Sequence, residues 1–433
     1  MKVSFITLGC RVNSYESDAM AGLLRARGFE VVPEGEFADV YDVNTCTVTN
    51  IADRKSRQMV SKCRRINPNA RVVVTGCWSQ RFPEEAAKLP GVCLVLGSAQ
   101  KNRIADYLEG IDGPVRTVVG DVMHAREFEE LSASAEGRTR AYLKIQDGCS
   151  RFCSYCAIPV ARGAVRSRSL DSVRRELEKL DSLGFAEVVL TGIHLTDYGR
   201  DLDGPTLADA IDCANGLDSV RRIRLGSLEP HGLTDEMISR ITANPKVCRQ
   251  FHLSLQSGSD TVLERMRRGY TSGEYEAIVS KIRAAYGQDA PRVAITTDVI
   301  AGFAGETEEE HNETLAFVRR IGFARMHVFP YSRRSGTRAD LMPGQLTNAQ
   351  KAARAQELIS VGREMEREFL RGFIGRDEQV LLETRQKDGL YSGYTDSYVR
   401  VCTAQGEPDT LVSVHIDSVK EDTNGEMSLL SHS

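Results

Sequence analysis

The chain has 433 residues, of which 41% are hydrophobic, and a formal net charge of -4. This length predicts two or three globular domains, and the net charge excludes a chain that is basic throughout, so any nucleic-acid binding must depend on local patches. Because its apolar runs are too short for a signal peptide or a membrane span, we expect a cytoplasmic protein that does not bind membranes. Its eleven irregularly spaced cysteines fit reduced thiols and metal ligands better than a disulfide framework.

The first part of the chain alternates short apolar runs with helical patterns, which is typical of an α/β fold with a parallel sheet. Cys10, Cys46 and Cys77 each stand just past such a run. Because the carboxyl ends of parallel strands share one edge of the sheet, we expect these three cysteines to converge there and hold a metal cluster, although a single buried cysteine is more often inert. We expect the side chains of Asn13 and Asn44 to donate hydrogen bonds to the cluster sulfurs.

A second set of cysteines lies further along the chain, in the segment DGCSRFCSYCA. Cys149, Cys153 and Cys156 have the spacing Cx3Cx2C, and Tyr155 precedes the last of them. Three thiolates leave one iron of a four-iron cluster open for another ligand, as catalytic metal sites do. A structural zinc site remains an alternative, with His194 or Cys213 as the next available ligands.

Repeated strand and helix patterns follow this motif and predict a full or partial parallel barrel, whose active site lies at the carboxyl ends of its strands. Several strand ends carry polar residues or glycines suited to a ligand, although glycine after a strand more often only makes a turn. The candidate cofactor-binding residues are Tyr155, Thr191, Gly192, Glu229, Gln256, Ser257 and Asp298.

Two arginine-rich segments are candidates for contact with phosphates or bases, against the alternative of ordinary solvated surfaces. The first includes Arg162, Arg166 and Arg168. The second, residues 319–338, contains no acidic residue and includes Arg333, Arg334 and Arg338.

From Gly375 the pattern changes to short strands, which suggests a small β-barrel-like module after a long helix at 346–374. We therefore predict four segments: an α/β domain at 1–120, a polar linker at 121–138, the barrel domain at 139–370 and the β module at 371–433.

Together these residues resemble the radical S-adenosylmethionine (SAM) methylthiotransferases over nearly the whole chain. The resemblance rests on both cysteine sets and on the segments AIPVARGAVRSRS, LTGIHLTDYG, LGSLEP, HLSLQSGSDTVLERMRRGYT and HVFPYS. It implies an N-terminal cluster domain, a radical SAM barrel and a C-terminal TRAM domain that binds tRNA. It also implies two [4Fe-4S] clusters, SAM, an electron donor and a sulfur source, the last two unidentified.

The segment LGCRVNSYES resembles the branch of this family that acts on N6-threonylcarbamoyladenosine, next to the anticodon of tRNA. The product implied for this branch is the 2-methylthio derivative of that nucleoside. A hydrogen on carbon 2 of adenine is neither acidic nor activated, so its removal requires a radical rather than a side-chain base. The resemblance implies that the Cx3Cx2C cluster generates this radical from SAM and that the N-terminal cluster holds the methylated sulfur.

Three other interpretations remain at this point. The chain could instead methylthiolate isopentenyladenosine in tRNA, or an aspartate of a ribosomal protein, or it could be a non-catalytic iron-sulfur protein that binds tRNA. The incomplete cysteine sets and the polar barrel mouth favour an enzyme. A threonylcarbamoyl group carries a carboxylate, so we expect Arg333, Arg334 or Arg338 to bind it.

Overall fold

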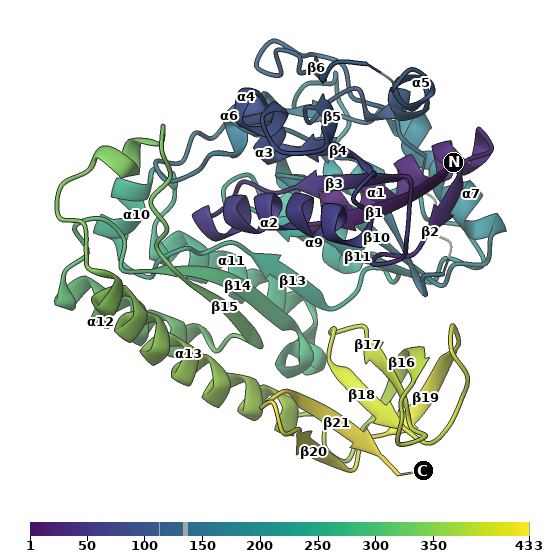
Figure 1. The fold of residues 1–433 in the computed structure, drawn as a ribbon. Coiled ribbons are helices and arrows are strands. Elements are labelled where there is room, and N and C mark those ends of the chain that lie inside the picture. The colour runs from purple at the N-terminus through teal and green to yellow at the C-terminus, as the bar shows by residue number, and fades with distance from the viewer. Residues whose placement is uncertain (112, 133–136, 433) are drawn as a thin grey trace.

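The computed structural model describes residues 1–111, 113–132 and 137–432. Figure 1 shows an α/β domain at the N-terminus, a central curved sheet lined by helices, and a separate β domain at the C-terminus. The predicted α/β class with a parallel N-terminal sheet, a partial barrel and a terminal β domain is confirmed. The described residues of the predicted linker form no helix or strand, and 133–136 lie outside the described residues.

The N-terminal domain is built on a six-stranded parallel sheet. Its central strand β3 is buried along its whole length, as expected of a parallel strand with both faces covered. In spatial order the strands are β2 (Glu30–Val32), β1 (Lys2–Thr7), β3 (Val40–Thr45), β4 (Arg71–Gly76), β5 (Val92–Leu96) and β6 (Arg116–Val118). The helices are α1 (Arg11–Ala26), α2 (Asn50–Ile66), α3 (Cys77–Arg81), α4 (Pro83–Ala87), the 3-10 turn η1 (Lys101–Arg103) and α5 (Ile104–Glu109).

The central domain is an open barrel of parallel strands in two hydrogen-bonded groups. The first group contains β11 (Arg222–Leu225), β10 (Glu187–Thr191) and β7 (Arg140–Lys144); the second contains β12 (Ser227–Leu228), β13 (Gln250–Leu253), β14 (Ala294–Ala301) and β15 (Arg325–Pro330). A short antiparallel ribbon joins β8 (Gln146–Asp147) to β9 (Arg166–Ser167) on either side of the cysteine loop. One large apolar core lies between this curved sheet and its helices.

Helices alternate with these strands, and polar caps define several of their starts. Thr307 at the start of α12 and Thr347 at the start of α13 each form a reciprocal capping box with the third helical residue. The helical segments are α6 (Ile158–Arg162), α7 (Leu170–Ser182), η2 (Leu195–Asp197), α8 (Leu207–Asp212), α9 (Asp235–Ala243), α10 (Asp260–Met266), α11 (Ser272–Ala285), η3 (Gly287–Arg292), α12 (Glu308–Ile321), η4 (Arg338–Leu341) and α13 (Asn348–Arg371).

The C-terminal domain is a curled six-stranded sheet with its own apolar core. All its pairings are antiparallel except that of β18 with β21. In spatial order the strands are β19 (Leu411–His415), β16 (Asp377–Arg385), β17 (Tyr391–Thr395), β18 (Arg400–Thr403), β21 (Met427–Ser431) and β20 (Ser418–Glu421).

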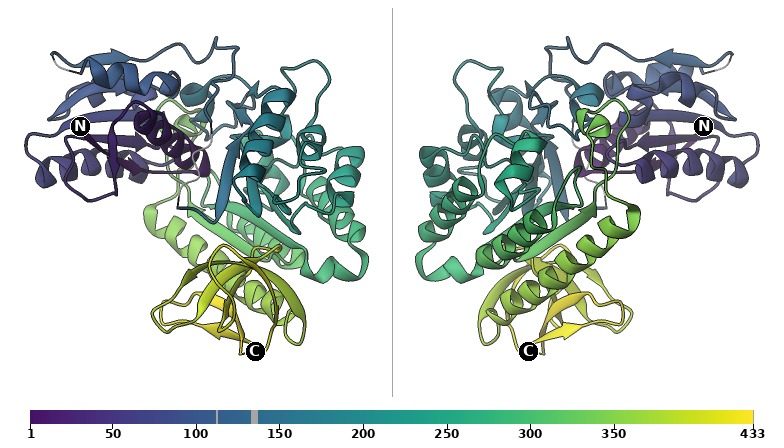
Figure 2. Two further views of the ribbon diagram at one scale, coloured as in Figure 1. Left: turned by 90° about the vertical axis from the view of Figure 1, so that its right-hand side faces the viewer. Right: turned by 90° about the vertical axis from the view of Figure 1, so that its left-hand side faces the viewer.

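The long helix α13 runs from the barrel to the C-terminal domain, and the N-terminal domain packs against the other side of the barrel (Figure 2). The N-terminal and C-terminal domains also meet, since Arg11 of the former lies over the ring of Tyr398 of the latter. No helix among the described residues has both the length and the apolar character needed to cross a membrane.

Candidate active site between two cysteine sets

Cys10, Cys46 and Cys77 follow three neighbouring strands of one sheet. Thr45 pairs with Gly76 across β3 and β4, so Cys46 and Cys77 leave the sheet side by side. Strand β1 lies on the other side of β3, and Cys10 caps the helix that follows it. The three sulfur-bearing residues thus converge at the carboxyl edge of the sheet, where ligands bind in folds of this kind.

The backbone near this edge is shaped by two glycines with positive φ. A Cβ on Gly9 (φ +101°) would lie 2.8 Å from the Cβ of Cys46 and 2.9 Å from its sulfur. A Cβ on Gly76 (φ +97°) would lie 2.5 Å from Oδ1 of Asn44. Only glycine leaves this space open beside the cysteines, because other residues rarely adopt this backbone conformation.

The second cysteine set lies in the loop between β8 and α6. The loop is held by backbone hydrogen bonds from Cys149 to Gly163 (2.9 Å) and from Cys156 to Cys153 (3.0 Å). Burial raises the pKa of Cys149 and of Cys156 to about 12. It does the same to Cys46 of the first set. The thiols therefore keep their protons in the metal-free protein, and binding of a metal cluster at either set must release them.

The donor chemistry of both sets fits an iron-sulfur cluster. Each set offers three thiols at one end of a parallel strand system. Within the described parts of the chain, no group of three His, Cys, Asp or Glu side chains is arranged to hold a single metal ion. His194 instead faces Asp197, and Cys213 donates to the carbonyl of Asp209, so neither joins the Cx3Cx2C loop as the fourth ligand of a zinc site.

The side chains of Asn13 and Asn44 do not serve as donors to the cysteine sulfurs, contrary to our expectation. Asn13 donates to the carbonyls of Leu8 and Thr45, and Asn44 donates to the Asn13 carbonyl and to Ser17. These hydrogen bonds brace the backbone around the N-terminal cysteines.

An arginine of the barrel domain, Arg162, donates the hydrogen bond to a cysteine sulfur that we expected from the asparagine side chains. Nε of Arg162 donates to the sulfur of Cys77 at 3.2 Å, and Arg162 is completely buried. Arg166 and Arg168 are also buried, and Arg168 donates to Tyr15. The prediction that these three arginines contact RNA from a basic surface is therefore corrected.

A second buried arginine, which sequence reasoning missed, contacts the other cysteine set. Nη1 of Arg268 donates to the sulfur of Cys153 at 3.3 Å and to the hydroxyl of Tyr155 at 3.2 Å. Its other nitrogen pairs with Glu229. The candidates Tyr155 and Glu229 therefore meet at this arginine, beside the Cx3Cx2C loop.

A cavity of about 880 Å³ extends from Cys10 through the barrel to the C-terminal domain. The predicted residues Thr191, Gly192 and Asp298 line it. His252 and His327 also line it, and His252 lies 3.5 Å from Asp298. Thr191 ends β10 as predicted, whereas Asp298 stands inside β14, as the two histidines that sequence reasoning missed stand inside β13 and β15.

Two further candidates support the barrel wall. Gln256 has a positive φ of 73° and is bound by its backbone to Asp298 and Ile300. Ser257 is buried against Thr314 of α12. Neither is among the residues that line the cavity.

The arginines that follow β15 do not line the cavity either. Arg334 is buried and forms an ion pair with Asp53, whereas Arg333 pairs with Asp340 at the surface. Arg338 is exposed at the start of η4. Burial of Arg334 contradicts the hypothesis for that residue, whereas for the exposed Arg333 and Arg338 the hypothesis that one of them binds a substrate carboxylate stays a prediction.

Other cations face the cavity. Arg11, next to Cys10, lies over the ring of Tyr398 at 5.6 Å, and Arg325 lies on β15. Across the described residues, neither forms an ion pair with a carboxylate within 4.0 Å. By contrast, Arg400 faces Glu426 at 3.7 Å.

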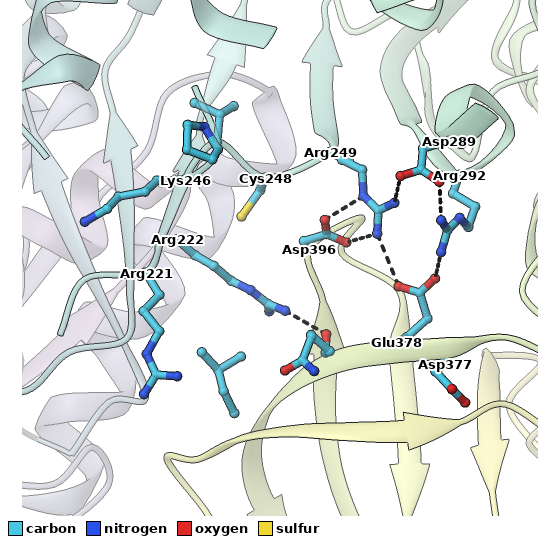
Figure 3. A pocket seen from close by; sticks show the side chains of 14 residues that line it. Arg221, Arg222, Lys246, Cys248, Arg249, Asp289, Arg292, Asp377, Glu378 and Asp396 are labelled. Carbon is cyan, nitrogen blue, oxygen red and sulfur yellow. Dashed lines mark hydrogen bonds and ion pairs between the residues drawn. The ribbon is translucent and has the colours of Figure 1, made fainter. Parts of the chain in front are cut away.

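A smaller hollow of about 520 Å³ separates the barrel from the C-terminal domain (Figure 3). Arg249 reaches across it to Asp396 (2.6 Å) and Glu378 (3.3 Å), and Arg292 also binds Glu378 (2.5 Å). This charged junction attaches the C-terminal domain to the barrel and lies apart from both cysteine sets.

Comparison with known proteins agrees with this geometry. Residues 143–318 match the Radical SAM superfamily, and residues 2–97 match the family described as "Uncharacterized protein family UPF0004". In fold, the chain is similar to the radical SAM methyltransferase TsrM from Kitasatospora setae, with a TM-score of 0.52 and 17% identity over 76% of this chain and 72% of that one. The fold and the Cx3Cx2C loop therefore define a radical SAM protein.

Relatives in sequence indicate which group of radical SAM proteins the chain belongs to. The chain is 39% identical, over 92% of its length and 89% of the relative, to the threonylcarbamoyladenosine tRNA methylthiotransferase MtaB of Bacillus subtilis. It is 36% identical to the MtaB of Thermotoga maritima, over 96% of this chain and 94% of that one. It is 34% identical to a tRNA-2-methylthio-N(6)-dimethylallyladenosine synthase of Dictyoglomus thermophilum, over 92% and 91%. The chain belongs to the radical SAM tRNA methylthiotransferases.

Proposed function

We propose that this enzyme converts N6-threonylcarbamoyladenosine, next to the anticodon of tRNA, into its 2-methylthio derivative. The relatives named for this substrate are 35–40% identical to the chain. The relatives named for dimethylallyladenosine are 33–35% identical. The sequence identities to the two groups of relatives differ by little, so the choice of substrate depends on the chemistry of the cavity.

The observation that carries the proposal is the unpaired positive charge beside Cys10. Arg11 and Arg325 line the same cavity as Cys10, and neither forms an ion pair there with a carboxylate of the described chain. Arg11 is half-buried and Arg325 is exposed, so both guanidinium groups can be reached by an anion that enters the cavity. The threonylcarbamoyl group supplies a carboxylate, which guanidinium groups bind well, whereas an isopentenyl group is apolar.

We assign the two cysteine sets to two [4Fe-4S] clusters, with SAM at the Cx3Cx2C set. These cofactors supply the radical and the methylated sulfur that an unactivated ring carbon requires. The chain contributes the position of the base, because the cavity that receives the adenine reaches from the barrel strands to Cys10.

The reaction also needs an electron donor and a source of sulfur, which we infer to be separate partners. Because its substrate is tRNA, we place the enzyme in the cytoplasm.

Nucleoside analysis tests the substrate directly. Mass spectrometry should find 2-methylthio-N6-threonylcarbamoyladenosine in tRNA from cells that contain the protein, and only the unmethylthiolated nucleoside in cells that lack it. Methylthiolated isopentenyladenosine that depends on the protein would contradict the proposal.

The role of the cavity cations requires a separate measurement. We expect Arg325→Ala to lower turnover on threonylcarbamoylated tRNA about 10- to 100-fold, the value of a charge-assisted hydrogen bond, while affinity for tRNA without the modification stays within about twofold. Arg338→Ala, at the surface outside the cavity, is the matched control and should not show this selectivity. Equal losses on both tRNAs with Arg325→Ala would remove Arg325 from substrate selection.

A further inference from the structure

Arg162 contacts the N-terminal cysteine set from the helix that follows the other set. It is the last residue of α6, the helix that follows the Cx3Cx2C loop, and its guanidinium contacts the N-terminal set through Cys77. We propose that Arg162 is a positioning residue that raises the reduction potential of the N-terminal cluster. The inference rests on a cluster being held by Cys10, Cys46 and Cys77, and is independent of which nucleoside is modified.

The guanidinium is held in one orientation by partners from two domains. Nη1 donates to Glu16 at 2.6 Å and to Asp147 at 3.2 Å. Nη2 donates to Asn13 at 2.7 Å and to Glu16 at 3.0 Å. Nε is left to donate to Cys77. A completely buried guanidinium with every nitrogen engaged cannot turn away from the sulfur without losing these bonds.

Each carboxylate around Arg162 is paired with more than one cation. Glu16 is completely buried and also binds Lys101 and Lys144, and Lys144 binds Asp147. Within this set, three cations face two carboxylates. Burial opposes the ionisation of Glu16, but these cations hold its pKa well below its ordinary value, so the network stays charged at neutral pH.

This environment favours the reduced form of a cluster at Cys77. Reduction places additional negative charge on the cluster and its sulfurs, and hydrogen bonds to those sulfurs and nearby charges are known determinants of potential. In a buried site the interaction is screened less than in water. Removing the donor should therefore make the N-terminal cluster harder to reduce.

Arg268 provides an internal comparison, because it makes the corresponding contact with Cys153 of the other set. It is nearly buried and bound to Glu229. If each arginine acts on the cluster that it contacts, substitution of one should leave the potential of the other cluster unchanged.

The experiment uses reconstituted full-length protein in which one cluster is removed at a time, with redox titrations followed by electron paramagnetic resonance. The first parent protein has Cys149, Cys153 and Cys156 replaced by alanine. In it, Arg162→Gln should shift the one-electron equilibrium of the remaining cluster about tenfold toward the oxidised form. This shift corresponds to a reduction potential about 59 mV lower. Arg162→Lys, which keeps the charge, should recover part of this shift.

The control is the protein with Cys10, Cys46 and Cys77 replaced by alanine. There, Arg162→Gln should change the equilibrium of the Cx3Cx2C cluster less than twofold, whereas Arg268→Gln should shift it. If Arg162→Gln does not fold, Arg162→Lys serves as the second variant, because it removes the Nε donor to Cys77 while keeping a cation beside Glu16, and it should give the smaller downward shift.

An unchanged potential of the N-terminal cluster in a fully loaded Arg162→Gln variant, or in Arg162→Lys where the glutamine variant does not fold, would overturn the proposal. Equal shifts of both clusters would overturn it as well, because they would indicate a general structural effect. Absence of iron from the N-terminal site in the parent protein would overturn it through the cluster assignment itself.

Discussion

Arg334, after the last barrel strand, forms a 2.8 Å ion pair with Asp53 of α2 in the N-terminal domain, and both side chains are nearly buried. The same guanidinium donates to Thr47 at 2.7 Å, next to Cys46. The loop after β15 is thereby attached to the loop that carries an N-terminal cysteine.

Breaking this pair should destabilise the protein. Arg334→Ala leaves Asp53 buried without its partner, which typically costs about 3–5 kcal/mol. We expect a clear fall in the melting temperature of the reconstituted protein by calorimetry. Arg333→Ala, which removes an exposed pair with Asp340, is the control and should cost at most about 1 kcal/mol. Similar melting temperatures for both variants would show that the buried pair adds no stability.

The two cysteine sets predict two four-iron clusters. Alanine at Cys149, Cys153 and Cys156 should lower the iron content of anaerobically reconstituted protein by about half, and alanine at the three N-terminal cysteines should do the same. Zinc in the wild-type protein, or a single cluster, would refute the model of two sites.

The two clusters should also differ in role. With Cys10, Cys46 and Cys77 replaced by alanine, reductive cleavage of SAM to 5′-deoxyadenosine should continue while methylthio transfer is abolished. Chromatography of the SAM products and mass spectrometry of the tRNA measure these activities separately. Loss of both in a folded variant would mean that the N-terminal cysteines are not a distinct site of sulfur transfer.

The charged junction in Figure 3 predicts how the C-terminal domain is attached. Arg249→Ala removes the hydrogen bonds to Asp396 and Glu378, so the segment between α13 and β16 should become more sensitive to limited proteolysis. Arg221→Ala, an exposed residue that lines the same hollow, should leave the digestion rate unchanged. Equal digestion of both variants and wild type would show that other contacts hold the domain.

Asp42 should make stability depend on pH. Burial raises its pKa to about 7, above the ordinary value near 3.9, although Thr75 donates a hydrogen bond to it. A raised folded-state pKa means that stability falls as pH rises from about 4 to about 7 and then levels off. Asp42→Asn keeps an acceptor for Thr75 without the charge, so its stability advantage should widen by about 2 kcal/mol between pH 5.5 and 8. A difference in melting temperature that does not change with pH would contradict this.

The sequence by itself determined the α/β class, the cysteine pattern and the strand ends that carry polar residues. These features depend on local patterns: apolar runs define strands, and residues that follow neighbouring parallel strands must share one edge of the sheet. For this reason the approach of Cys10, Cys46 and Cys77 was predictable from positions far apart in the chain.

Only the tertiary structure decided what each arginine does. Arg162 and Arg334 stand in basic segments that predict an RNA surface, yet both are buried against carboxylates, Glu16 and Asp53, from another domain. Arg325, from the same basic segment as Arg334, instead faces the cavity. A cysteine's place at a strand end follows from local sequence, but the partner of a long charged side chain depends on which distant acid the packing of domains brings within hydrogen-bond reach.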